Sequence, residues 1–504
     1  MKKNNDVISE LLEGKNVVAV LCLQFGDTGK GKFVDILSSW ADIIVRGGGG
    51  NNCGHTTVVD YKTIVTHLIP SGISYDSQGK INIIGSGTVV DPIALSKEMI
   101  KLKEIGITFD NFLISHKAHF VTIAEILYDR IQESVACSGK IGSTGRGIGP
   151  AYSDFIGRNG LFINDLLNAE ILKAKLKKHF AKYKTILKNY DSELVMKIMH
   201  HSDLGSWKFY DAEEIFNLEA IYRYYLGLGD ELHNYICDTD EFVRVNLGKK
   251  KILLEGAQGT LLSVKYGTYP YVTSSDCSLA GLAEGAGLQK SDVDLSLGIF
   301  KGFYETRVGC GPFPTELGGV ESDNWCNGKG NRERELETDL DDRASVNSPN
   351  EFYQGIGIRR AGNEYGATTG RPRRVGWLDL PLLKYAIKIN GPHTILTKVD
   401  VLNEVKIIRI CTDYIYRGFN INYAGKEIHT GDVLDVAITD SEILQYCEAF
   451  YKEFPGWLCD ISECTNYESL PKELKTILEF IIQESGIKPW AISIGADREE
   501  TIFL

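Results

Sequence analysis

Short runs of apolar, often β-branched residues alternate along the chain with segments whose apolar residues recur at helical spacing. The first run, residues 16–23, is apolar at nearly every position, as in a strand that is buried on both faces. Strands that alternate with helices usually form a parallel sheet, so the pattern predicts an α/β fold with a large, mostly parallel central sheet flanked by helices. The predicted strands are 16–23, 43–46, 80–84, 111–115, 251–254, 294–299 and 394–397, and the predicted helices include 32–40 and 92–105.

The same pattern predicts a single large domain over residues 16–504, preceded by a polar tail, residues 1–15, that frays or forms a short helix. Residues 160–245 carry Leu, Ile and Tyr at helical spacing, which predicts a helical subregion. Residues 319–361 form a polar insertion. Its centre, residues 322–351, is rich in Asn, Asp, Glu and Arg, and this composition favours a solvated or disordered segment.

Composition narrows the class of protein. The net charge of −12 argues against a general nucleic-acid binder, which needs a basic surface. No apolar run reaches the roughly 18 residues of a membrane span. The 11 cysteines lack metal-ligand spacing, which favours free thiols in a reducing compartment and a cytoplasmic location.

A glycine-rich turn follows the first predicted strand and precedes a predicted helix. It reads Gly-Asp-Thr-Gly-Lys-Gly-Lys over residues 26–32. Glycines let backbone N–H groups approach a phosphate, and a helix N-terminus favours the anion, so we expect a phosphate-binding loop. An ordinary P-loop has a magnesium-binding Ser or Thr where this chain has Phe33, so Asp27 is the candidate metal ligand. The alternative is a plain glycine-rich turn.

A second glycine-rich stretch, residues 47–54, leads to His55. A lone histidine is more often a structural hydrogen-bonding group than a catalyst. Here an acid, Asp27, and an imidazole, His55, flank one expected phosphate site. That pair suits proton abstraction and charge stabilisation in phosphoryl transfer.

Longer motifs, in order along the chain, resemble the adenylosuccinate synthetase family. They are QFGDTGKGK at 24–32, NCGHT at 52–56, HLIPSG at 67–72, GSTGRGIGPAY at 142–152, EGAQGTLL at 255–262, GTYPYVTSS at 267–275, TRVG at 306–309, GPFPTE at 311–316 and GNEYGATTGR at 362–371. The resemblance runs from about residue 16 to the C-terminus, and several of its motifs are long and distinctive.

The resemblance implies a GTP-dependent ligase that activates IMP at its 6-oxygen with the γ-phosphate of GTP. L-Aspartate then displaces phosphate to give adenylosuccinate. By resemblance, Asp27 removes the purine N1 proton, His55 donates to the transferring phosphoryl group and Gln258 reads the 6-oxygen. Asp27 and the carbonyl of Gly54 hold one Mg²⁺ per site, and Lys30 contacts phosphate.

The family pattern also assigns the three substrates of the reaction. The matching positions for GTP are Gly26, Gly29, Lys30, Gly31, Lys32, Gly54, His55, Thr56, Lys398, Asp400, Ser493 and Gly495; for IMP they are Asp27, Lys30, Asn52, Gly54, Thr144, Arg158, Gln258, Thr273 and Arg371; for aspartate they are Thr368, Thr369, Arg371 and Arg373.

Two of these assignments have a physical rationale of their own. An Asp at position 400 accepts hydrogen bonds from guanine N1–H and the 2-amino group, which adenine lacks; the alternative is an ordinary strand-end motif. Paired guanidiniums suit a dicarboxylate, although a solvated basic turn has the same composition. Arg158 matches an arginine that the family supplies from a neighbouring subunit, which implies a homodimer; the alternative is a surface charge.

The sequence also departs from the family pattern around the expected site. Thr28 replaces a Glu, Phe155 replaces a Lys and Ala496 replaces a Pro, while Gly47, Gly48 and Asn51 replace larger residues. These departures leave open a relative that uses another purine nucleotide such as (d)GMP. A catalytically silent nucleotide-binding paralogue has no reason to retain Asp27, His55 and the two-arginine loop together. Phe33 disfavours a generic P-loop GTPase switch.

Overall fold

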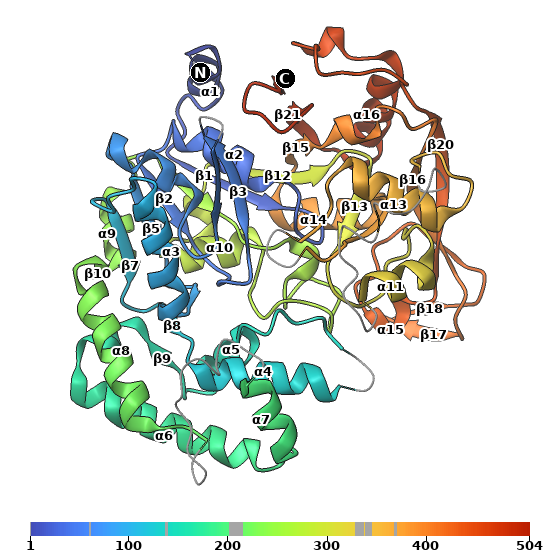
Figure 1. The fold of residues 1–504 in the computed structure, drawn as a ribbon. Helices are drawn as coiled ribbons and strands as arrows, with labels where there is room; N and C mark the ends of the chain where they lie inside the picture. Colours follow the sequence, from blue (N-terminus) through green and yellow to red (C-terminus); the bar gives the residue numbers. More distant parts are fainter. Residues whose placement is uncertain are drawn as a thin grey trace.

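A large sheet crosses the whole molecule (Figure 1). The computed structural model describes residues 2–59, 62–136, 140–200, 215–327, 337, 345–366 and 370–504. The strands of the large sheet lie in the order β10-β7-β5-β2-β11-β1-β12-β15-β21-β22. Every neighbouring pair is parallel except β21 and β22 at one edge. The α/β fold predicted from the sequence is confirmed.

Seven of the ten strands that the described residues form in this sheet were predicted, and these seven begin and end close to their predicted positions. Across the sheet the strands are β10 (Ile236–Cys237), β7 (Phe112–Ser115), β5 (Ile81–Ile84), β2 (Ile43–Arg46), β11 (Ile252–Glu255), β1 (Val17–Cys22), β12 (Leu295–Lys301), β15 (His393–Thr397), β21 (Lys488–Ser493) and β22 (Thr501–Phe503). The seven strands predicted from apolar runs all belong to this sheet, because a continuous apolar run is typical of a strand covered on both faces.

Side chains of alternate residues of β1 enter two different cores. Ala19 and Leu21 point to the core that includes α10 (Leu279–Gly285), α14 (Leu380–Asn390) and α16 (Lys472–Ser485). Val18 and Val20 point to the opposite core, which α2 (Lys30–Ser38) covers. The N-terminal tail contributes to this second core as a short helix, α1 (Lys2–Leu11), because Ile8 is buried there.

A helical lobe packs below the β10 side of the sheet in Figure 1 and has its own apolar core. Most of the described residues between 160 and 245 are helical. The helices of the lobe and its border are α3 (Pro92–Glu104), α4 (Ile123–Val135), α5 (Ile148–Ile156), α6 (Ala169–Leu187), α7 (Ser192–His200), α8 (Leu218–Leu232) and α9 (Thr239–Asn246). None of the helices formed by the described residues has the length and apolar character needed to cross a membrane.

A second sheet covers the opposite end of the molecule (Figure 1). It consists of β13 (Tyr304–Arg307), β14 (Arg374–Asp379), β16 (Ile407–Tyr416), β19 (Val433–Leu434) and β20 (Cys447–Pro455). Smaller sheets are formed by β3 (His55–Val59) with β4 (Lys62–Thr66), by β17 (Ile421–Tyr423) with β18 (Lys426–Ile428), and by β6 (Val89–Val90), β8 (His119–Phe120) and β9 (Leu161–Phe162).

The polar insertion packs more closely than its composition suggested. Residues 328–336 and 338–344 lie outside the described residues. The described part begins as α11 (Gly319–Asn327) and ends as α13 (Glu351–Ala361), and Ser322, Cys326 and Glu337 are buried. Glu337 is ion-paired with Arg359 and accepts a 2.7 Å hydrogen bond from Trp325. Ser322, Cys326 and Glu337 are therefore buried within a segment whose composition predicted solvation, and Glu337 is held there by Arg359 and Trp325.

Three glycines allow α10 to cross the loop after β2 at very short range. A Cβ atom at Gly285 would lie 1.7 Å from the carbonyl oxygen of Gly47, and one at Gly87 would lie 2.5 Å from the same oxygen. Gly47, one of the departures from the family pattern, therefore lies in a backbone crossing that has no space for side chains.

We predict that Gly285→Ala lowers the free energy of unfolding by about 1–3 kcal/mol, because the added methyl group overlaps backbone. Gly227→Ala is the matched control. Gly227 is also helical, in α8, but a Cβ there meets nothing within 4 Å. The control should be neutral or gain up to about 1 kcal/mol of helix propensity. Urea unfolding of both variants measures the difference, and equal stabilities would contradict the close crossing.

Candidate functional site

Most of the predicted site residues follow the carboxyl ends of neighbouring parallel strands. The phosphate loop follows β1, the loop to His55 follows β2, and Gln258 follows β11. Lys398 and Asp400 follow β15, and Gly495 follows β21. Because these strands are parallel neighbours, their carboxyl ends meet at one edge, where ligands of open α/β sheets bind.

The phosphate loop turns sharply between β1 and α2. Asp27 and Gly29 both have left-handed backbone conformations, with φ of 52° and 77°. The Lys30 ammonium donates a 2.7 Å hydrogen bond to the carbonyl of Gln258, which joins the loop to the segment after β11. Lys32 donates to Ser493 Oγ at 2.8 Å and to the carbonyl of Gly495 at 2.9 Å. Burial lowers the pKa of Lys32 to about 8.

A buried carboxylate holds the imidazole of His55. Nδ1 of His55 is ion-paired with Glu255, which is fully buried at the end of β11. Ser71 fixes that carboxylate by donating from its backbone N–H at 2.8 Å and from its hydroxyl at 2.9 Å. The other ring nitrogen, Nε2, lies 3.4 Å from the thiol of Cys53. A carboxylate only accepts, so Nδ1 carries a proton and the ring orientation is set.

The pKa values of this group agree with a charged arrangement. Burial alone would lower the pKa of His55, but Cys53 and Glu255 raise it above its ordinary value. Burial would raise the pKa of Glu255, and the facing imidazole outweighs this effect and lowers it. The thiol of Cys53 has its pKa lowered to about 6, because His55 and Arg46 outweigh its burial.

The residues assigned to the purine lie on several loops. Gln258 has φ of 47°, and its amide donates a 3.0 Å hydrogen bond to Asn52 Oδ1. Its own Oε1 is buried and has no hydrogen-bond partner in the described part of the chain. Thr273 is half-buried and its N–H donates to the carbonyl of Leu262 at 2.8 Å, whereas Thr144 is exposed in the helical lobe. The structure thus brings Gln258 and Asn52 into contact directly.

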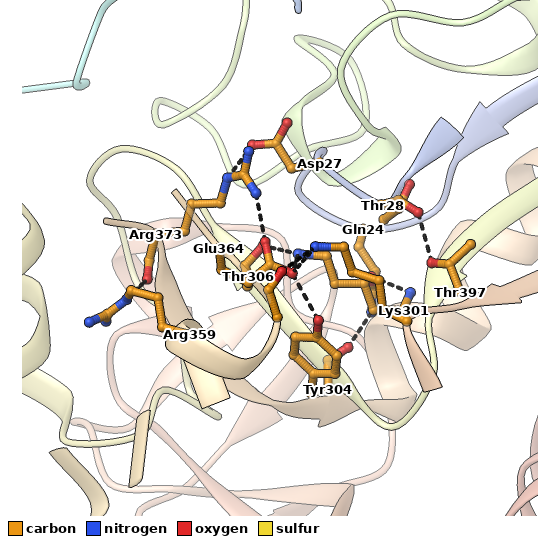
Figure 2. Close-up of polar contacts among 12 residues, drawn as sticks. Gln24, Asp27, Thr28, Lys301, Tyr304, Thr306, Arg359, Glu364, Arg373 and Thr397 are labelled. Carbon is orange, nitrogen blue, oxygen red and sulfur yellow. Dashed lines mark hydrogen bonds and ion pairs between the residues drawn. The ribbon is translucent and has the colours of Figure 1, made fainter. Parts of the chain in front are cut away.

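The loop between α13 and β14 carries the residues that the family pattern assigns to L-aspartate, and it is called the aspartate loop below. Its two arginines have different partners. Thr368 and Thr369 lie outside the described residues, and the side chain of Thr56 likewise is not described. Arg371 donates from Nε to the carbonyl of Cys326 at 2.9 Å. Arg373 Nε is ion-paired with Asp27 at 2.8 Å and its Nη1 with Glu364 at 2.6 Å (Figure 2).

Glu364 is the centre of the polar cluster in Figure 2. It is fully buried and pairs with Lys301 and Lys398, each at 2.8 Å, in addition to Arg373. Burial would raise the pKa of Glu364, but these cations hold it well below its ordinary value. Burial lowers the pKa of Lys301 to about 7. For Asp27, burial is outweighed by Arg373 and Lys301, which hold its pKa low.

Lys398 and Asp400, which the family pattern assigns to guanine, lie on a turn after β15. Lys398 has a left-handed backbone with φ of 56°, and its ammonium also donates to the carbonyl of Gly362 at 2.9 Å. Asp400 is half-buried, and burial raises its pKa against the opposing charges of Lys398 and Lys32. The carboxylate of Asp400 thus lies within electrostatic reach of Lys32 in the phosphate loop.

Arg158 lies away from the sheet edge, in the turn after α5. It is exposed, has φ of 61°, and has no ion pair with another described residue. The turn itself is anchored, because Asn159 N–H donates at 2.8 Å to the carbonyl of Asp154. The Asp154 side chain is buried and accepts a 2.9 Å hydrogen bond from Tyr183.

Glu125, Asp154 and His179 are the group of metal-capable side chains that the described residues bring closest together, within 4.8 Å of one another. They lie in the helical lobe, on α4, α5 and α6, and not at the sheet edge. Lys182 already forms an ion pair with Asp154, and His179 lies 3.0 Å from Glu125. The cluster is therefore an ionic core that joins three helices.

Comparison with known proteins decides the family. The family model for adenylosuccinate synthetase matches residues 19–502. The adenylosuccinate synthetase of Geobacter sulfurreducens is 38% identical over 97% of this chain and 98% of its own, and that of Halothermothrix orenii is 39% identical over 96% and 97%.

The chain belongs to the adenylosuccinate synthetase family.

Solved structures agree with this membership. The fully ligated adenylosuccinate synthetase of Plasmodium falciparum matches with a TM-score of 0.75 and 32% identity, over 97% of this chain and all (100%) of the other. The succinoaminodeoxyadenylate synthetase of cyanophage S-2L, solved with dGMP and dATP, matches with a TM-score of 0.51 and 17% identity, over 97% and 95%. This second likeness shows the fold alone. Family membership confirms the ligase class expected from the motifs, and the alternative paralogue is not favoured.

Sequence reasoning missed three residues that hold the site together. Glu255 was visible as the first residue of a family motif, but only the fold shows that it faces His55. Glu364 likewise belongs to a family motif without a role. Lys301 ends an apolar strand and has no motif signal at all.

Two residues that depart from the adenylosuccinate synthetase pattern, Thr28 and Phe155, form defined contacts in the structure. Thr28 is fully buried, and its carbonyl accepts a 2.7 Å hydrogen bond from Thr397 Oγ1. Phe155 stacks on His119 with ring centroids 3.9 Å apart. Burial lowers the pKa of His119 to about 4. An aromatic ring at position 155 therefore covers a neutral imidazole.

We predict that the protein loses stability as the pH falls from 6.5 towards 4. In this window the unfolded chain protonates His119, whose ordinary pKa is near 6.5, and the folded protein does not. The shift corresponds to about 3 kcal/mol. In His119→Gln the loss between these pH values should be smaller. Urea unfolding at several pH values measures it, and an identical pH slope in the variant would contradict a neutral buried His119.

Proposed function

We propose that this protein joins L-aspartate to IMP through a 6-phosphoryl intermediate, with GTP as phosphoryl donor, and releases adenylosuccinate, GDP and phosphate. The observation that carries the proposal is the meeting of four groups at one sheet edge. These are the phosphate loop, the carboxylate of Asp27, the oriented imidazole of His55 and the amide of Gln258. Family membership supplies the reaction class, and the residues supply the roles.

Asp27 acts first, as the base for the purine. Removal of the N1 proton moves electron density to the 6-oxygen, which then attacks the γ-phosphorus while GDP leaves. The ion pair with Arg373 uses Oδ2 of Asp27, and the carboxylate is 35% exposed. Oδ1 is therefore available to a purine N1–H. Gln258 lies on the adjoining loop, and its amide NH2 donates one hydrogen to Asn52, so the second hydrogen is the one that can donate to the 6-oxygen.

His55 stabilises the transferring phosphoryl group. Its Nδ1 faces Glu255, so Nε2 is the nitrogen that donates to charge that develops on phosphate oxygens. Lys30 and the backbone N–H groups of the loop bind the same phosphates. Preorganised donors of this kind require no reorientation during the reaction, which is why a buried carboxylate behind the imidazole matters.

The loop also offers oxygen ligands for magnesium. The carboxylate of Asp27 and the carbonyl of the exposed Gly54 are hard donors of the type that Mg²⁺ takes together with substrate phosphates. When bound, the ion would neutralise charge on the β- and γ-phosphates. Both residues adjoin the phosphate-binding groups, so the donor set fits one ion per site.

The second half of the reaction needs L-aspartate and a guanine reader. Arg371 and Arg373, with Thr368 and Thr369, form the loop for the two carboxylates, and the amine of aspartate attacks C6 as phosphate leaves. Asp400 accepts from guanine N1–H and the 2-amino group, while Ser493 and Gly495, held by Lys32, line the same end of the sheet.

The test is aspartate-dependent GDP release by the purified protein, with IMP, GMP and dGMP each offered as purine. We expect release with IMP alone. Asp27→Asn and His55→Asn should each lower kcat by a factor of about 100 or more, in line with the loss of an acid–base or charge-stabilising group. Release with GMP or dGMP in place of IMP would refute the substrate, and near wild-type kcat in either variant would refute that residue's role.

We further propose a homodimer in which Arg158 reaches the partner's IMP site. Two observations support this: the side chain is exposed without an ion-pair partner among the described residues, and its turn is anchored through Asp154. An arginine fixed on a rigid surface turn is suited to bind a phosphate that lies outside its own subunit.

Mixing Asp27→Ala protomers with Arg158→Leu protomers should restore activity, because one site of each mixed dimer then has both residues intact. Arg223→Leu is the control, since Arg223 is also an exposed helical-lobe arginine, with a side chain 75% exposed. That variant should be fully active alone. If subunit exchange is demonstrated by mass measurement and activity does not return, the shared site is refuted.

A further inference from the structure

One buried carboxylate, Glu364, binds cations from three segments that the proposed reaction uses for different purposes. Arg373 belongs to the aspartate loop and Lys301 to β12, the strand beside the phosphate loop (Figure 2). Lys398 belongs to the turn after β15 that carries Asp400, here called the guanine turn. Tyr304 donates a fourth contact to Glu364 at 2.8 Å. Asp27, the other carboxylate labelled in Figure 2, pairs with Arg373.

The two carboxylate oxygens of Glu364 have different partners. Oε1 accepts from Lys301, Lys398 and Tyr304, while Oε2 faces Nη1 of Arg373. Arg373 thus lies between Glu364 and Asp27, with one guanidinium nitrogen for each carboxylate. The Nη1 contact with Glu364 is a directional hydrogen bond and orients the planar guanidinium, while the contact with Asp27 is a charge pairing.

The contact with Lys398 fixes a backbone that would otherwise be strained. Lys398 has φ of 56°, which side-chain-bearing residues rarely adopt, and its ammonium reaches back to Glu364 and to the carbonyl of Gly362. Asp400, two residues later, takes its position from this turn. The same carboxylate therefore orients the guanine reader and the arginine of the aspartate loop.

We propose that Glu364 is a positioning residue that serves the GTP and L-aspartate sites together, so that both sites depend on one buried charge. This inference rests on the proposed function for the identity of the two ligands. Glu364 touches neither ligand; it acts through Lys398 and Arg373. Removing its charge while keeping its shape leaves the buried cations without their counter-ion, and both neighbouring loops lose their anchor.

The test compares Glu364→Gln with Glu316→Gln. Glu316 is a matched control, because it is a buried glutamate paired with Arg374, the residue next to Arg373, and within the described part of the chain it forms no ion pair or hydrogen bond with Lys398, Arg373 or Asp27. Glu364→Gln should raise KM for GTP and for aspartate at least tenfold each and change KM for IMP less than threefold. Glu316→Gln should leave all three KM values within threefold of wild type.

Circular dichroism shows whether Glu364→Gln folds. If it does not, Tyr304→Phe tests the same proposal. This variant removes one neutral donor to Glu364 and leaves every charge in place. It should raise the same two KM values together, by about two- to fivefold. A rise in only one of them, in either variant, would overturn the shared role, as would an equal effect of Glu316→Gln.

Calorimetric binding of GDP separates this inference from the proposed function. GDP tests the guanine turn without turnover, so it applies even if the wild-type protein shows no aspartate-dependent GDP release with IMP. Glu364→Gln should weaken GDP binding at least tenfold relative to both wild type and Glu316→Gln. Unchanged GDP binding would refute the positioning role of Glu364, while loss of turnover in the wild type alone would refute only the proposed substrates.

Discussion

Parallel pairing of neighbouring strands is the constraint on which the rest of this structure depends. Because β2, β11, β1, β12, β15 and β21 all run the same way, the segments that follow them are delivered to one edge. Residues more than 400 positions apart in sequence, such as Lys32 and Ser493, meet there. Each loop can then differ in length and chemistry while the sheet keeps its end point fixed.

Pairing of buried charges is the second constraint on the site, and it depends on the parallel pairing of the strands. A carboxylate that ends or adjoins a strand is removed from water, so it must be paired; Glu255 pairs with an imidazole and Glu364 with three cations. A buried ion pair adds little net stability, but removing one partner is costly. Such pairs therefore specify geometry, and here they specify the directions of His55 and Arg373.

The departures from the family pattern cluster where the structure can absorb them. Gly47 lies in a backbone crossing with Gly285 and Gly87, so a small residue there brings α10 closer to the loop before His55. Phe155 stacks on a neutral imidazole in the helical lobe. Neither change removes a group that carries the proposed chemistry, and Gln258 contacts both Lys30 of the phosphate loop and Asn52.

The sequence by itself determined the parallel α/β class, seven strands of the main sheet and the family. Buried strands and glycine-rich loops leave local signals: an apolar run for β1, fixed glycine and lysine spacing for the loop after it. Only the tertiary structure decided which charges meet. The pairing of Glu255 with His55 joins residues 200 positions apart, and Lys301 ends its strand without any motif signal. The packing of Glu337 in a polar insertion was likewise hidden, because burial of a charged residue depends on partners that arrive from elsewhere in the chain.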